Sequence, residues 1–149
     1  MNKKEIKHDQ YADFYLSNLI NALILFSFSK TELKKIAGPG FNPIFELETE
    51  VDYAFTPVCF ETIFRKGLIH SKHKQRLLDF KKQADEIPDE IWDMEFIDNR
   101  NEWIAIRKKA NQLLGLLCIN ERKLNEDYLT IYDSDGTLVK RGEKVADKP

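Results

Sequence analysis

The chain has 149 residues, a formal net charge of −2 at pH 7 and 42% hydrophobic residues. This length predicts a single domain with a core large enough to fold without disulfides or a structural metal. The near-balanced charge argues against a dedicated nucleic-acid-binding protein, since such proteins usually carry a basic excess. The two cysteines, Cys59 and Cys118, stand in apolar helical contexts. We therefore expect both to be reduced, buried thiols of a cytoplasmic protein.

The first predicted helix covers residues 9–28 and has apolar residues on most of its circumference. Its apolar part, Leu16 to Phe28, is shorter than the roughly 20 residues that span a bilayer, and it contains Asn18 and Asn21. It also lacks the small-residue cleavage site of a signal peptide. A central helix that is contacted from several sides is expected, with no membrane association.

Sequence signals for helix starts and stops divide residues 29–67 into short predicted helices. Ser29 and Glu32 have the spacing of a capping box, and Gly38 would end the short helix that follows. Asn42-Pro43 then resembles an N-cap followed by a first-turn proline, and Thr56-Pro57 repeats this signal. Residues 44–55 fit both an alternating strand and a helical stripe, and the proline start together with the Glu, Leu and Ala content favours a helix. The helix after Pro57 is expected to end at Gly67.

Two more helices are predicted in the second half. Ser71 is expected to cap a helix that runs to about Glu86 before Pro88, and residues 87–99 should form a short helical turn and a loop. Asp98 or Asn99 would cap the last long helix. Its buried stripe consists of Trp103, Ile106, Ala110, Leu113, Leu114 and Leu117.

A β-hairpin is predicted near the C-terminus. Its strands are Tyr128 to Ile131 and Thr137 to Lys140, joined around Ser134, Asp135 and Gly136. The fold prediction is therefore a mainly α, single-domain bundle of five to six helices with a short C-terminal β-hairpin at about residues 128–140. The domain would span residues 1–141, and residues 142–149 would form a flexible tail.

Asp133 and Asp135 invite a catalytic interpretation. An apolar run followed by Asp-x-Asp-Gly-Thr resembles the first motif of haloacid-dehalogenase-type phosphatases. The resemblance implies a magnesium-dependent phosphohydrolase in which the first Asp attacks phosphorus and the second transfers a proton. Because little chain follows the motif, we expect a strand–turn–strand element instead. The stretch also resembles the YD repeats of large bacterial shell proteins, which are themselves strand–turn elements.

No other pattern predicts a catalytic, metal or cofactor site. His70 and His73 share a helical spacing, but neighbouring lysines would repel a cation and no third ligand has a matching position. Glu46, Glu50 and Asp52 are interpreted as a solvated acidic helix face. We expect no enzyme activity and no cofactor.

Charge is arranged in blocks along the chain. A basic stretch over residues 65–82 precedes an acidic stretch over residues 85–98 that contains no basic residue. We expect Trp92 and Phe96 to be exposed aromatics within an acidic docking patch, which would attract a basic partner and anchor it by ring burial. The candidate partner-binding residues are Asp89, Glu90, Trp92, Asp93, Glu95, Phe96 and Asp98.

Four segments resemble small bacterial helical proteins that look like the immunity proteins of polymorphic toxins. They are residues 40–47, 51–57, 91–93 and 101–107, within a similarity that covers about Thr31 to Asn120. The resemblance implies stoichiometric capture of a cognate toxin, often a basic nuclease, and it carries over no functional residue. The alternatives are a cytoplasmic adaptor or regulatory protein unrelated to toxins, or the phosphohydrolase.

Overall fold

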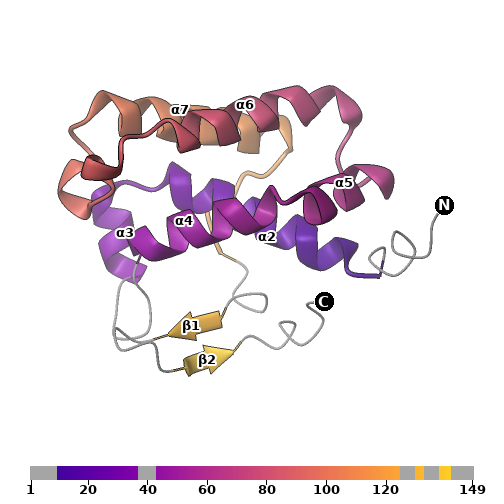
Figure 1. The fold of residues 1–149 in the computed structure, drawn as a ribbon, viewed down its shortest axis with the longest axis horizontal. Helices are drawn as coiled ribbons and strands as arrows, with labels where there is room; N and C mark the ends of the chain where they lie inside the picture. The colour runs from indigo at the N-terminus through magenta and orange to yellow at the C-terminus, as the bar shows by residue number, and fades with distance from the viewer. Residues whose placement is uncertain (1–9, 37–42, 125–129, 133–137, 142–149) are drawn as a thin grey trace.

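The computed structural model describes residues 10–36, 43–124, 130–132 and 138–141. The prediction of a mainly helical protein is confirmed, and six α-helices lie in the described residues (Figure 1). They are α2 (Ala12–Ser27), α3 (Lys30–Ile36), α4 (Pro43–Ala54), α5 (Pro57–Arg65), α6 (Lys74–Asp85) and α7 (Asn101–Leu116). Three 3₁₀ turns accompany them: η1 (Ser71–His73), η2 (Asp89–Ile91) and η3 (Met94–Phe96).

Helix α2 is the centre of the bundle. It packs against α4, α5 and α7, and twelve of its residues are buried. Leu19 and Leu23 lie one turn apart on the same side of the helix and Leu25 lies on nearly the opposite side, yet each is 0% exposed. A helix that is apolar over most of its circumference can only be stable when it is surrounded, which is why the wide apolar coverage predicted this position correctly.

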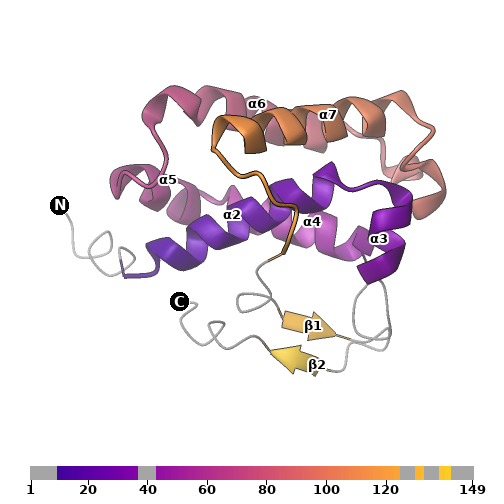
Figure 2. The same ribbon diagram turned by 180° about the vertical axis from the view of Figure 1, so that it is seen from behind.

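Helices α6 and α7 form an antiparallel pair that lies across α2 and α4 (Figures 1 and 2). The connection between them, with η2 and η3, lies at one end of this pair. Aromatic rings fill the space beneath it: the Phe26 ring lies 5.4 Å from that of Phe80 and 6.1 Å from that of Trp103. Edge-to-face and stacked pairs of this kind fix the spacing of the two layers.

Several local signals produce the expected helix ends. The Ser29 N–H donates to Glu32 Oε1 at 3.0 Å and the Glu32 N–H donates to Ser29 Oγ at 3.2 Å, so the predicted capping box starts α3. Residues 44–55 lie almost entirely in α4, which resolves their ambiguity in favour of the helix. Gly67 adopts φ 69°, and the N–H of Leu68 donates to the Ile63 carbonyl, which closes α5 with a glycine C-cap.

Two predicted helix caps are wrong. His70 caps η1, because its Nδ1 accepts the Lys72 N–H at 3.0 Å, and Ser71 is already inside η1. Helix α6 follows directly, with His73 at its N-cap and no side-chain cap bond. Helix α7 has Arg100 at its N-cap, without a side-chain cap bond, instead of Asp98 or Asn99. Before α6 the 3₁₀ turn η1 takes the capped position. Before α7 the side chains of Asp98 and Asn99 are bound elsewhere, Asp98 to the Lys30 N–H and Asn99 to the Glu95 carbonyl.

Of two further expectations about individual residues, the position of Thr56 is confirmed and the burial of Cys118 is corrected. Thr56 precedes the first-turn proline of α5 as predicted, but its hydroxyl donates to the Tyr53 carbonyl at 2.8 Å and so contacts the end of α4. Cys59 is buried, whereas Cys118 is exposed and has φ 62° in the turn after α7. The stretch around Cys118 was interpreted as helical, but the helix ends two residues earlier.

Two short strands, β1 (Thr130–Tyr132) and β2 (Leu138–Arg141), pair antiparallel, with a register shift between Ile131 and Tyr132. The turn expected around Asp135 lies outside the described residues, as does the tail 142–149, so the complete hairpin stays a prediction. Within the described ranges, none of the helices has both the length and the apolar character to cross a membrane.

Candidate functional site

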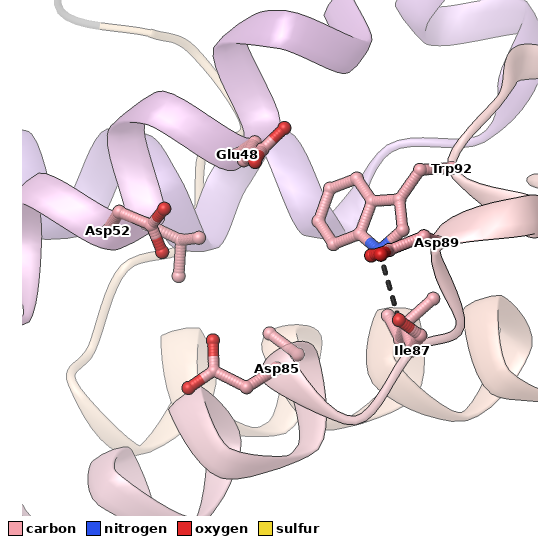
Figure 3. Close-up of a pocket in the computed structure, with 8 residues that line it drawn as sticks. Glu48, Asp52, Asp85, Ile87, Asp89 and Trp92 are labelled. Carbon is pink, nitrogen blue, oxygen red and sulfur yellow. Dashed lines mark hydrogen bonds between the residues drawn. The ribbon is translucent and has the colours of Figure 1, made fainter.

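An acidic cleft of about 380 Å³ lies between α4 on one side and the end of α6 and the segment after it on the other. Four carboxylates surround a small apolar floor, and the Trp92 indole stands at one end (Figure 3). The lining residues are Glu48, Val51, Asp52, Ala84, Asp85, Ile87, Asp89 and Trp92. We call this the acidic cleft.

Lys81 joins the two walls of the acidic cleft. Its Nζ lies 3.2 Å from Asp52 Oδ1 and 2.5 Å from Asp85 Oδ1. Partial burial lowers the pKa of Lys81, but the hydrogen bonds to Asp85 and Asp52 outweigh it and leave the pKa above its usual value. Glu48 and Asp89 form no ion pair with any residue in the described part of the chain. Counting the residues that the structure describes, four carboxylates against one ammonium give the cleft an excess of three negative charges.

Trp92 is held rigidly at the end of the cleft. Its Nε1–H donates to the Ile87 carbonyl at 3.2 Å, and its ring lies 4.9 Å from that of Trp103 in an edge-to-face contact. Both Trp92 and Phe96 are half-buried against the core, so the prediction that they are exposed aromatics is wrong. The two rings are partly buried because the 3₁₀ turns alternate apolar residues inward and acidic residues outward. The Trp92 indole still lines the cleft.

The remaining residues of the predicted patch separate into two groups. Glu90, Asp93 and Glu95 are exposed beside the acidic cleft, together with Asp89 in its wall. Asp93 also accepts the Glu95 N–H at 3.3 Å and thereby starts η3. These four residues provide a rim of negative charge next to the cleft.

Asp98 stabilises the fold instead of belonging to this rim. Its Oδ1 accepts the N–H of Lys30, at the start of α3, at 3.0 Å and lies 2.5 Å from Arg107 Nη2 on α7. The hydrogen bond from the Lys30 backbone and the Arg107 guanidinium hold the pKa of Asp98 below its usual value, although partial burial opposes them. Asp98 therefore ties α3 to α7.

Sequence reasoning missed the α4 wall of the acidic cleft. Glu48 and Asp52 are one helical turn apart and both exposed, so they share a face of α4. Asp85 belonged to the recognised acidic stretch but not to the predicted site. The helical spacing of Glu48 and Asp52 was a usable signal, but nothing in the sequence shows that this face lies opposite the end of α6.

Glu46 does not belong to a solvated face, as was predicted. It is 5% exposed in the first turn of α4, and burial raises its pKa to about 7. No hydrogen bond or ion pair joins its carboxylate to another described residue. Glu50 is half-buried, and only Asp52 of the predicted acidic face is exposed. A carboxyl group that is half ionised near neutral pH and lies inside the bundle makes the stability of the fold depend on pH.

The other candidate residues give no assembled site. His70 serves as a helix cap, and slight burial together with Lys72, His70 and Arg76 lowers the pKa of His73. Among the residues that the structure describes, no three His, Cys, Asp or Glu side chains are grouped as metal ligands would be. Asp133 and Asp135 lie outside the described residues. No family model, curated protein or solved structure matches this chain.

Proposed function

We propose that this protein is a non-catalytic, cytoplasmic binding module that docks a basic protein partner on the acidic cleft and its rim. The observation that carries the proposal is the excess of three negative charges in a cleft with an aromatic end wall, built from two separate parts of the chain. Charge of one sign in a concave surface attracts an opposite charge over distance and speeds its encounter.

The cleft has the chemistry to receive a lysine or arginine side chain of the partner. Glu48 and Asp89 are available for ion pairs, and the Trp92 ring is the aromatic surface that cations prefer. Because Trp92 is fixed by Ile87 and Trp103, little side-chain freedom would be lost on binding. Glu90, Asp93 and Glu95 would mainly accelerate association, since they remain solvated.

Neutralisation of a cognate bacterial toxin is the specific form of this function that we favour. The resemblance to toxin-immunity proteins and a preformed acidic surface both support it, because toxin domains that cleave nucleic acids are often basic. An adaptor of a cellular basic protein would use the same cleft, and the identity of the captured protein distinguishes the two.

The first test is affinity capture with the tagged protein from cells that produce it, followed by washes at increasing salt. Wild-type protein should retain one basic protein stoichiometrically and release it as salt rises. An Asp85→Asn, Asp89→Asn variant should lose it, whereas an Asp79→Asn, Glu121→Gln variant, which removes the same charge elsewhere, should keep it. Capture that is equal for all three proteins would place the interface on another surface.

A further inference from the structure

A second groove of about 600 Å³ lies between the beginning of α6 and the end of α7. Figure 1 shows that these helix ends meet at the end of the α6–α7 pair opposite the η2–η3 connection. The groove is lined by Arg76, Lys109, Gln112, Leu113, Gly115 and Leu116. We call it the basic groove.

The basic groove combines unpaired cations with an apolar surface. Neither Arg76 nor Lys109 forms an ion pair with a residue that the structure describes. Between them, Leu113 forms a buried floor and Leu116 is 39% exposed. Lys109, Leu113 and Leu116 recur at three- and four-residue spacing, so they share one face of α7. Such a surface fits an acidic segment that also carries apolar side chains.

Gly115 gives a second reason to regard the basic groove as a docking surface. It occupies an ordinary helical position in α7, where glycine is less stable than alanine. A Cβ at this position would meet no atom within 4 Å, so no packing contact requires a glycine. The missing side chain instead leaves open the space in which another backbone could approach.

We propose that the basic groove receives the acidic η2–η3 turn of a second copy of this chain, in a head-to-tail contact. Charge complementarity supports this occupant, because Glu90 and Glu95 are exposed on that turn and no basic residue lies between residues 85 and 98. Met94 and Phe96, half-buried on the same turn, supply the apolar component. The contact is heterologous, since it joins different surfaces of the two copies.

This inference is independent of the proposed function, because it concerns copies of the chain alone. It adds a consequence: a basic partner on the acidic rim would compete with self-association. The test is analytical ultracentrifugation of the purified full chain over a range of concentrations at low salt. The average mass should rise above 17.5 kDa with concentration and return to 17.5 kDa at high salt.

The variant Gly115→Leu should weaken self-association without destabilising the fold, so it tests the docking surface separately from folding. The added side chain should fill the basic groove and weaken self-association at least tenfold. The melting temperature should stay unchanged or rise by about 2 °C, because a helix-favouring residue replaces glycine in open space. Gly115→Ala, which adds only one carbon, should show a smaller loss of association.

A charge-exchange pair tests the head-to-tail geometry. The variants Arg76→Glu, Lys109→Glu and Glu90→Lys, Glu95→Lys should each be monomeric alone. When they are mixed, the unaltered acidic turn of the first can enter the unaltered groove of the second, so association should return. A mass that stays at 17.5 kDa at every concentration of the wild-type protein would overturn the proposal, and so would association that none of these variants changes.

Discussion

The burial of Glu46 leads to a quantitative prediction about stability and pH. Its pKa rises from 4.5 to about 7 on folding because its carboxylate loses water inside the bundle. Well below pH 4.5 the carboxyl group is protonated in both the folded and the unfolded chain, so its ionisation does not lower the free energy of unfolding. As pH rises, the unfolded chain ionises first, so the folded state loses relative stability until its own carboxyl group ionises near pH 7.

The size of this effect follows from the change in pKa. A difference of one unit corresponds to about 1.4 kcal/mol, so the cost above pH 7 approaches about 3 kcal/mol. Glu46→Gln keeps the shape of the side chain and removes the ionisation. We compare the free energy of unfolding of the variant with that of the wild type at each pH. This difference should shift in favour of the variant by about 2 to 3 kcal/mol between pH 4.5 and pH 8.

Urea denaturation followed by circular dichroism, at pH 4.5 and pH 8, measures this double difference. Other titrating groups contribute equally to both proteins and cancel. Glu48→Gln, at an exposed position of the same helix, is the matched control and should show a clearly smaller double difference, because its side chain is not buried. An equally small value for Glu46→Gln would refute the reasoning, because it would mean that the carboxylate is solvated or paired in the folded protein.

Three further predictions concern stability. Cys118→Gly should raise the free energy of unfolding by up to about 1 kcal/mol in urea denaturation, because φ 62° disfavours side chains other than glycine. Asp98→Ala should lower it by about 1.5 kcal/mol, since two helices lose a shared charged hydrogen-bond acceptor. Lys81→Met should lower the melting temperature by about 3 °C by leaving Asp52 and Asp85 without their bridging ammonium, and unchanged melting would show that solvent already screens this pair.

The fold followed from local signals to a large extent. Apolar residues on most sides of residues 12–27 predicted a central helix, and the capping box at Ser29 and the glycine stop at Gly67 depend only on residues a few positions apart. Cap prediction failed before α6, where a 3₁₀ turn comes first, and before α7, where the side chains of Asp98 and Asn99 bind other backbone groups. Local sequence gives the presence of a helix more reliably than the identity of its first residue.

The site was predicted only in part, because it is formed by residues far apart in the chain. Asp89 and Trp92 lie in the recognised acidic stretch, but Glu48 and Asp52 join them only through the packing of α4 beside α6. The sequence alone also could not show that Glu46 is buried and Glu48 exposed. Both are glutamates near the start of one helix, and only the position of that helix in the bundle decides that the first is buried and the second exposed.

The most direct test of binding through the acidic cleft is the kinetics of association with the isolated partner at several salt concentrations. We predict that Asp85→Asn, Asp89→Asn weakens affinity about 30-fold, equivalent to about 2 kcal/mol, and makes the association rate less dependent on salt. The Asp79→Asn, Glu121→Gln control should retain the affinity of the wild type. Equal affinities and equal salt dependence for all three proteins would contradict a function that depends on the acidic cleft.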